Sequence, residues 1–302
     1  MKKILVTDGM EKEALAALRA KGYEVTEKFF EPEELAKNLG AFDAVVVRSA
    51  TKVRQPIIDE AKKGNLKLII RGGVGVDNID VAYAEQNGIA VRNTPKASTA
   101  SVAELALAHM FALARFIGIS NFTMRNGEWN KKKYEGVEIA GKTLGIVGFG
   151  RIGRELAAKA HALGMNIIAT DVMKVENAPD YAKIVSFEEV LENSDFISLH
   201  VPMPKDKKPV ITAKEIGMMR DGAFIINAAR GGIIDETALC DALDSGKLAG
   251  AGLDVYAEEP SKNERLLKNP KVSLTPHIGG STKEAQKRIG MEIVDIIEGF
   301  FA

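Results

Sequence analysis

The chain has 302 residues, enough for two domains, and 41 basic residues balance 41 acidic ones. This balance argues against nucleic acid and against an acidic membrane surface as partners. Cys240 is the single cysteine, so an internal disulfide and a cysteine-based metal site are excluded; we expect no metal and a reducing compartment, the cytoplasm. The N-terminus becomes acidic too early for a signal peptide, and no apolar run approaches the roughly 18 residues of a membrane span.

Short apolar runs alternate with amphipathic helical patterns in the N-terminal third of the chain. A helix over residues 11–21 would place Ala14, Leu15 and Leu18 on one face. This alternation is typical of a parallel sheet with helices on both sides. The strands expected in this part are 4–7, 23–26, 44–48, 68–70 and 89–91.

A long apolar helix is expected to begin at Ser101, which forms a capping box with Glu104, and to run to residue 119. A helix that is apolar on all sides is usually buried, so His109 within it should be structural. The polar segment 124–141 should then leave the core before strands and helices resume. The later strands are expected at 144–147, 166–170, 196–199, 223–226, 250–253 and 272–274, and the last helix near Ser281, with a capping box from Ser281 to Glu284.

A glycine motif at 148–153 lies between the strand expected at 144–147 and a helix expected at 154–163. In this context G-x-G-x-x-G is the fingerprint of dinucleotide binding. Gly148 would allow the tight turn, Gly150 the approach of a pyrophosphate, and Gly153 the packing of helix on strand, while the helix N-terminus attracts the phosphates. Asp171 ends the next strand, where its carboxylate should accept the ribose hydroxyls and repel the 2′-phosphate of NADP. Lys174 is a weaker, opposing signal.

The position of the motif in mid-chain predicts an insertion. We expect a nucleotide-binding domain of residues 96–280 within a second domain made of 1–95 and 281–302. Both should be α/β domains with doubly wound parallel sheets, a Rossmann fold inserted into a flavodoxin-like substrate domain. Two crossings between domains would make a hinge, and a cleft between hinged domains is a natural ligand site.

Hydride transfer between an alcohol and NAD needs a base for the hydroxyl proton and a cation for the substrate's charge. His277 lies in a turn between a strand and a helix, where it could reach a cleft or serve as a local cap. Arg230 ends another strand and could bind a carboxylate, or form a surface salt bridge. A carboxylate of the loop 254–260 could orient His277, although a solvated acidic loop is the alternative. His200, at a strand end near the cofactor, and His161, at a helix end, are expected to be structural.

These segments together resemble the D-isomer-specific 2-hydroxyacid dehydrogenases, and the resemblance extends over the whole chain. It rests on the glycine motif and on residues 227–235, 251–260 and 275–282. It implies that His277 is the acid–base group, that Glu259 supports its protonation and that Arg230 holds the substrate's carboxylate and carbonyl oxygens. It also implies NAD as cofactor and a homodimer. The expected cofactor contacts are Val74, Gly148, Gly150, Arg151, Ile152, Gly153, Asp171, His200, Val201, Pro202, Ala228, Ala229, Arg230, Asp254, His277, Gly279 and Gly280.

Within this family, residues 47–51 and 71–78 are most similar to the D-3-phosphoglycerate dehydrogenases. The expected reaction is the oxidation of D-3-phosphoglycerate to 3-phosphohydroxypyruvate, the entry to serine synthesis. A phosphorylated substrate needs additional positive charge, and Arg48 and Arg71 each lie where a strand meets a loop. The expected substrate contacts are Arg48, Ser49, Arg71, Gly72, Gly73 and Asn78.

The sequence differs from that subfamily in two ways, and two alternative functions remain open. Relatives supply a basic residue to the partner's substrate from the stretch that holds Lys131, Lys132 and Lys133 here, and lysine would bind phosphate only as a point charge. Longer relatives continue into a serine-binding regulatory domain, so with the chain ending at Ala302 we expect no inhibition by serine through such a domain. The alternatives are a general D-2-hydroxyacid dehydrogenase that reduces hydroxypyruvate, glyoxylate or pyruvate, and an NAD(H)-sensing corepressor-like interaction protein.

Overall fold

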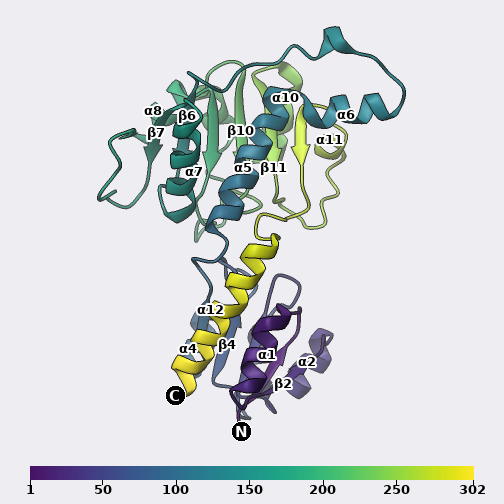
Figure 1. Ribbon diagram of the computed structural model, residues 1–302, viewed down its shortest axis with the longest axis vertical. Helices are drawn as coiled ribbons and strands as arrows, with labels where there is room; N and C mark the ends of the chain where they lie inside the picture. The colour runs from purple at the N-terminus through teal and green to yellow at the C-terminus, as the bar shows by residue number, and fades with distance from the viewer. The chain divides into compact units, whose positions relative to one another are not determined.

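The computed structural model describes residues 1–302, which divide into two compact units. Unit 1 consists of Met1–Ser98 and Gly280–Ala302, and unit 2 of Thr99–Gly279. Both ends of the chain therefore lie in unit 1 (Figure 1).

Unit 1 contains a five-stranded sheet in which all paired strands are parallel. The strand order is β2-β1-β3-β4-β5, the flavodoxin-like order, which changes direction between β1 and β3. Ligands of open α/β sheets bind beyond the carboxyl ends of the strands at such a point. The strands are β1 (Lys3–Val6), β2 (Glu24–Glu27), β3 (Ala44–Val47), β4 (Leu68–Arg71) and β5 (Ala90–Asn93).

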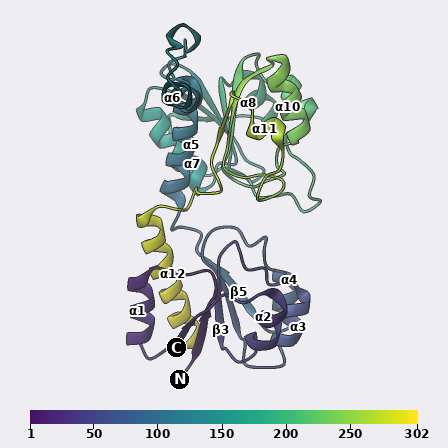
Figure 2. The same cartoon turned by 90° about the vertical axis from the view of Figure 1, so that its right-hand side faces the viewer.

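Helices cover both faces of this sheet (Figure 2). On one face α1 (Lys12–Ala20) packs beside α12 (Lys283–Phe301), and the predicted apolar face of α1 is buried against the sheet. The other face is covered by α2 (Pro32–Leu39), α3 (Gln55–Ala61) and α4 (Val81–Gln86). Each face thus has its own apolar core.

Unit 2 contains a seven-stranded parallel sheet in the order β12-β11-β10-β9-β6-β7-β8. This is the Rossmann order, and its direction changes between β6 and β9. The prediction of two doubly wound parallel sheets is confirmed. The strands are β6 (Thr143–Val147), β7 (Asn166–Thr170), β8 (Ala182–Ile184), β9 (Phe196–Leu199), β10 (Ala223–Asn227), β11 (Leu248–Leu253) and β12 (Val272–Leu274).

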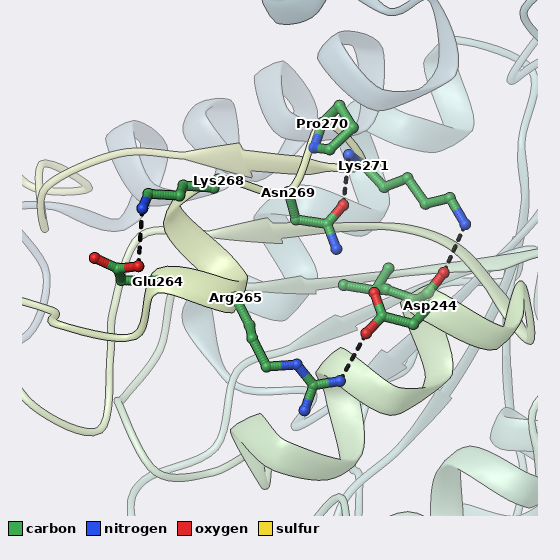
Figure 3. Close-up of a pocket in the computed structure, with 8 residues that line it drawn as sticks. Asp244, Glu264, Arg265, Lys268, Asn269, Pro270 and Lys271 are labelled. Carbon is green, nitrogen blue, oxygen red and sulfur yellow. Dashed lines mark hydrogen bonds and ion pairs between the residues drawn. The ribbon is translucent and has the colours of Figure 1, made fainter.

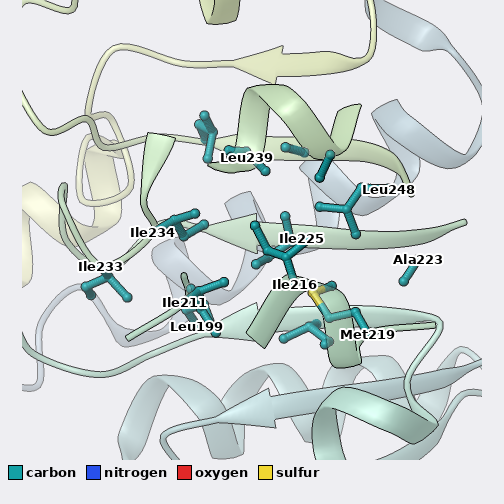
Figure 4. Close-up of a cluster of buried hydrophobic side chains, with 14 of the residues drawn as sticks. Leu199, Ile211, Ile216, Met219, Ala223, Ile225, Ile233, Ile234, Leu239 and Leu248 are labelled. Atoms are coloured by element: carbon teal, nitrogen blue, oxygen red, sulfur yellow. The ribbon is translucent and has the colours of Figure 1, made fainter. Parts of the chain in front are cut away.

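Two helices cover one face of the second sheet, α5 (Thr99–Ala114) and α7 (Arg151–Ala162) (Figure 2). The opposite face carries α8 (Phe187–Asn193), α9 (Ala213–Met218), α10 (Glu236–Ser245) and α11 (Glu264–Leu267). Figure 4 shows the apolar cluster between that face and its helices, including Ile225 and Leu239.

The expectations for three helix ends were wrong. The helix α5 begins at Thr99, so Ser101 lies inside it, buried, and does not cap it. It ends at Ala114 because Phe116 has a φ of 54°, a left-handed conformation that a right-handed helix cannot contain. The chain turns there into α6 (Ile117–Arg125). The cap of α12 is Thr282, not Ser281, since its side chain accepts a hydrogen bond from the N–H of Ala285 at 3.1 Å.

The segment after α5 has little buried surface. No residue of α6 is buried, and a short 3-10 helix, η1 (Lys131–Lys133), follows it. In both views α6 and the following loop extend from the rest of unit 2 (Figures 1 and 2).

No single helix is long and apolar enough to cross a membrane, although α5 and α6 pass that test together with a 62° bend between them.

Candidate active site

The glycine motif forms the turn between β6 and α7, and each glycine has a different neighbour. Gly148 has a φ of 95°, and a Cβ there would lie 2.5 Å from the carbonyl oxygen of His200. A Cβ on Gly153 would lie 2.3 Å from the carbonyl oxygen of Gly148. A Cβ on Gly150, by contrast, would meet no atom within 4 Å, and no side chain caps α7. The turn therefore leaves open space beside an uncapped helix N-terminus, which fits a pyrophosphate.

Asp171 follows β7 and lies beside this turn. Its Oδ2 accepts a hydrogen bond from the N–H of Phe149 at 2.8 Å, and its Oδ1 accepts one from the N–H of Met173 at 2.9 Å. The guanidinium of Arg154 donates to the carbonyl oxygens of Glu176 and Asn177 and so braces the loop beyond Asp171. These bonds hold the Asp171 carboxylate beside the glycine turn. This position fits the predicted hydrogen bond from a ribose hydroxyl.

His200, Val201 and Pro202 follow β9, the strand next to β6. The ring of His200 forms a hydrogen bond to the hydroxyl of Ser198 at 2.9 Å, and its Nδ1 is buried. Burial lowers the pKa of His200 to about 4, so the ring is neutral at neutral pH. A neutral, enclosed ring fits the structural role expected for His200.

The loop after β10 is held by Asn227, which is 2% exposed. The side chain of Asn227 accepts a hydrogen bond from the N–H of Ala229 at 3.1 Å and donates one to the carbonyl oxygen of Arg230 at 2.9 Å. Gly231 lies against the backbone of Tyr256, since a Cβ there would be 1.7 Å from the carbonyl oxygen of Tyr256. These contacts place Arg230 beside the loop that follows β11.

That loop carries Glu259, which pairs with His277. Nδ1 of His277 lies 2.8 Å from Oε2 of Glu259, and each side chain is 38% exposed. Burial raises the pKa of Glu259, but the hydrogen bond from His277, the N–H of Tyr256 and the charges of His277 and Arg230 bring it below its usual value. An ionised Glu259 can only accept, so Nδ1 carries a proton and Nε2 is left to exchange one with a ligand.

Asp254 holds the turn that contains His277. It is 1% exposed, and its carboxylate accepts hydrogen bonds from the hydroxyl of Thr275 at 2.6 Å and from the N–H groups of Ile278 and Gly279, both at 2.8 Å. Asp254 was expected among the cofactor contacts. In the structure both of its oxygens accept hydrogen bonds from the turn. A contact between Asp254 and the cofactor is therefore a proposal.

In unit 1, the loop from Arg48 to Thr51 is held from two sides. Asp8, two residues after the end of β1, accepts hydrogen bonds from the N–H groups of Arg48 and Thr51 at 2.7 and 3.0 Å. Nδ2 of Asn78 donates to the carbonyl oxygens of the same two residues at 2.7 and 2.6 Å. Asn78 was expected to contact substrate, but its amide protons are committed to this loop. Asp8 was not expected, although its position after β1, at the change of strand direction, was a usable signal.

The two arginines expected to bind phosphate meet at the same glycine pair. A Cβ on Gly73 would lie 1.4 Å from Nη1 of Arg71, so the guanidinium packs over this glycine. A Cβ on Gly72 would lie 3.7 Å from Cγ of Arg48. Both side chains therefore adjoin the Gly72–Gly73 backbone, where the absence of side chains leaves them room.

Comparison with known proteins decides the family. Residues 107–279, more than half of the chain, match the model of the D-isomer specific 2-hydroxyacid dehydrogenase NAD binding domain. A hydroxypyruvate reductase of Thermotoga maritima is 47% identical over 299 residues, which cover 98% of this chain and 97% of the relative. This chain belongs to the D-isomer specific 2-hydroxyacid dehydrogenases. The resemblance drawn from the motifs is therefore confirmed, and so is NAD as the cofactor.

Other relatives of this dehydrogenase carry different names. The D-3-phosphoglycerate dehydrogenase of Archaeoglobus fulgidus is 45% identical, covering 98% of this chain but 56% of the relative. The chain thus spans little more than half the length of that relative. Among solved structures, a glyoxylate reductase from Paecilomyes thermophila superimposes with a TM-score of 0.89 at 36% identity, covering 98% of this chain and 94% of that one. These relatives establish the family but carry names with different substrates. The choice of substrate must therefore be argued from the residues proposed to bind it.

A hollow elsewhere on the dehydrogenase contains none of the candidate site residues. It has a volume of about 390 Å³ and lies where α10, α11 and the start of β12 meet (Figure 3). Its charged side chains pair locally: Arg265 with Asp244, and Lys268 with Glu264. Nζ of Lys271 donates to the carbonyl oxygen of Leu243.

The remaining histidines are also outside the site, since His161 stacks on Tyr181 at 4.3 Å and His109 is buried in α5.

Proposed function

We propose that this dehydrogenase oxidises D-3-phosphoglycerate to 3-phosphohydroxypyruvate, the first step toward serine. The observation that carries the chemistry is the pair formed by His277 and Glu259, 2.8 Å apart. Bound NAD supplies the hydride acceptor. As the C2–H bond breaks and its electron pair leaves as hydride to that acceptor, Nε2 of His277 would take the hydroxyl proton and C2 would become a carbonyl. Glu259 then stabilises the imidazolium through Nδ1.

Arg230 is proposed to bind the substrate's carboxylate and the oxygen on C2. Its guanidinium offers parallel N–H donors, a geometry that suits a carboxylate. Its charge also contributes to the lowered pKa of Glu259, which places it within electrostatic reach of the acid–base pair. A positive charge there stabilises the carbonyl oxygen as it forms.

Arg48 and Arg71 are proposed to bind the phosphate group. Support comes from their meeting at Gly72–Gly73 and from the hydrogen bonds of Asp8 and Asn78, which fix the backbone at Arg48. An arginine on a fixed loop loses less conformational entropy when it binds a phosphate oxygen. The phosphorylated acid is the ligand that uses both of these charges.

A hydroxypyruvate reductase is the second candidate. The Thermotoga relative with that name is 47% identical over 98% of this chain, and the phosphoglycerate dehydrogenase of Archaeoglobus fulgidus is 45% identical over the same share. The same residues would serve, with protonated His277 giving its proton to the carbonyl oxygen. Only the use of Arg48 and Arg71 would differ.

Steady-state rates on phosphorylated and unphosphorylated substrates test the choice. NADH absorbance is followed with D-3-phosphoglycerate and D-glycerate in one direction, and with phosphohydroxypyruvate and hydroxypyruvate in the other. We expect kcat/KM to favour the phosphorylated member of each pair. Arg48→Ala should lower kcat/KM for the phosphorylated substrate by about 10- to 100-fold, the loss of a charged hydrogen bond, and should affect glycerate far less.

Arg54→Ala is the matched control, because Arg54 is an arginine of the same unit that pairs with Asp80. Arg54→Ala also removes one positive charge, but at a position that does not adjoin the Gly72–Gly73 backbone. It should therefore leave the preference for the phosphorylated substrate unchanged. Equal rates on both members of a pair, together with no effect of Arg48→Ala, would refute phosphoglycerate as the substrate and favour hydroxypyruvate.

We also propose that the enzyme is a homodimer in the cytoplasm and that α6 takes part in the dimer contact. Its exposed apolar side chains include Ile117, Phe122 and Met124, which are 52%, 62% and 53% exposed, and Trp129 beyond it is 76% exposed. Apolar surface of this kind is typical of a protein interface. A second copy is the partner that the family resemblance implies.

A further inference from the structure

The buried histidine of α5 has an organised polar environment that the proposed chemistry does not use. His109 is 2% exposed and lies against β11, where a Cβ on Gly252 would be 2.7 Å from its own Cβ. Its Nδ1 lies 2.9 Å from the hydroxyl of Ser273, and its Nε2 lies 3.1 Å from the hydroxyl of Thr275. Both ring nitrogens of this histidine therefore have a partner.

The directions of these hydrogen bonds follow from Asp254. Its carboxylate only accepts, so the hydroxyl proton of Thr275 is donated to it, at 2.6 Å. The oxygen of Thr275 must then accept from Nε2–H of His109. Burial lowers the pKa of His109 and the charge of Asp254 offsets only part of this, so the ring is neutral and Nδ1 accepts from Ser273. The four side chains form one directed chain that ends at Asp254.

The end of this chain holds the turn on both sides of His277. Thr275 precedes His277, and Ile278 and Gly279 follow it; all three donate to the carboxylate of Asp254. His277 itself has a φ of 55°, a left-handed conformation that costs free energy in a residue other than glycine. Such a conformation persists only where the surrounding contacts enforce it, and the Asp254 bonds do so here.

We propose that His109 is a positioning residue for His277 that acts through Thr275 and Asp254. By donating to Thr275 it fixes the direction of the Thr275 hydroxyl, and so keeps the turn in the conformation that presents Nε2 of His277. An apolar side chain could fill the same space, whereas a buried histidine is tolerated only when both nitrogens are bonded, as Ser273 and Thr275 ensure. The proposal rests on the acid–base role proposed for His277.

Two substitutions of His109 separate its hydrogen bond from its volume. His109→Leu keeps an apolar filling but has no donor, whereas His109→Gln keeps an N–H that can reach Thr275. We expect His109→Leu to lower kcat by about 10- to 100-fold through misplacement of His277, with a much smaller change in the substrate's KM. His109→Gln should recover most of the lost rate. Met110→Leu, a buried change at the next residue of α5, is the packing control and should leave kcat unchanged.

A double-mutant cycle tests the route through Thr275. Thr275→Val removes the hydroxyl at almost constant volume. If His109→Leu does not fold, the single variant Thr275→Val still tests whether the hydrogen bond between His109 and Thr275 affects kcat. If His109 acts through Thr275, the double variant should be no slower than Thr275→Val alone. Effects that multiply would show that His109 acts by another route and would overturn the proposal.

Hydrogen exchange provides a measurement that does not depend on activity. His109→Leu should accelerate exchange of the N–H groups of Ile278 and Gly279, while the amides of α7 stay protected. His277→Asn tests the proposed function separately: if its turnover survives, the assignment of the base is wrong, but the exchange result still stands. Unchanged kcat and unchanged exchange in folded His109→Leu would refute the positioning role.

Discussion

His200 and His277 both follow strands of the sheet in unit 2, but the two side chains differ in their exposure to solvent. Nδ1 of His200 is buried, while the side chain of His277 is 38% exposed and faces Glu259. Removal of a histidine from water disfavours its charged form, whereas a partnered ring at the surface can gain and lose a proton. Burial therefore separates a structural histidine from one suited to acid–base chemistry.

The pKa of His200 predicts acid destabilisation. It is lowered from 6.5 to about 4 in the folded protein, so between these values the unfolded chain binds more protons than the folded one. The stability that neutral His200 contributes is complete above pH 6.5 and is lost as the pH falls to about 4, by at most roughly 3 kcal/mol. Urea unfolding at several pH values would measure it. The difference between wild type and His200→Gln should shrink across this window, and a constant difference would contradict the assignment.

Single residues also mark how far the sequence could predict the site. A partner for His277 in the loop after β11 was predicted, and the resemblance selected Glu259; in the structure the adjacent Glu258 pairs with Lys262 instead. The bonds from Asp8 to the Arg48 loop were not predicted, because they join residues 40 positions apart and no local pattern signals them.

At the scale of elements, the turn between β6 and α7 assigns separate tasks to its glycines. Gly153 is required by packing, because any Cβ there would collide with the backbone of Gly148. Gly150 has open space around it and a φ of −77°, which any residue can adopt. Packing within unit 2 does not require its lack of a side chain, and we propose that this lack makes room for the pyrophosphate.

Two alanine substitutions test this division. Gly150→Ala should leave the melting temperature nearly unchanged and weaken NADH binding by about tenfold or more, since its methyl group occupies the space proposed for the pyrophosphate. Gly153→Ala should destabilise the protein by about 1–3 kcal/mol through overpacking. Thermal denaturation and NADH fluorescence titration measure the two effects. Wild-type NADH affinity in Gly150→Ala would refute the proposed phosphate position.

Most elements followed from local patterns, and the exceptions have physical causes. The apolar runs predicted 11 strands, at positions close to those observed, but β8 was missed. This strand has three residues at the edge of the sheet, and only Ala182 of them is buried, so it lacks an apolar run. The break at Phe116 was missed because apolar residues continue beyond it at Ile117 and Ile119.

At the scale of the whole molecule, the proposed homodimer predicts a sensitivity at α6. Phe122→Glu would place a charge in the proposed contact, and we expect it to shift the enzyme toward monomer in sedimentation velocity at unchanged helix content. Phe29→Glu is the control, because Phe29 is 52% exposed but lies in unit 1. A monomeric wild type, or equal effects of both substitutions, would refute α6 as the dimer contact.

The sequence by itself determined the fold class, the cofactor and the family of this protein, because these depend on apolar periodicity and on motifs a few residues long. Apart from the pair of His277 and Glu259, only the tertiary structure decided which polar groups meet. The bond from His109 to Thr275 spans 166 positions, and the bonds from Asp254 to the turn that follows β12 span 21 to 25. Contacts of this kind depend on the register of neighbouring parallel strands and on how α5 packs against them, and no local pattern encodes either.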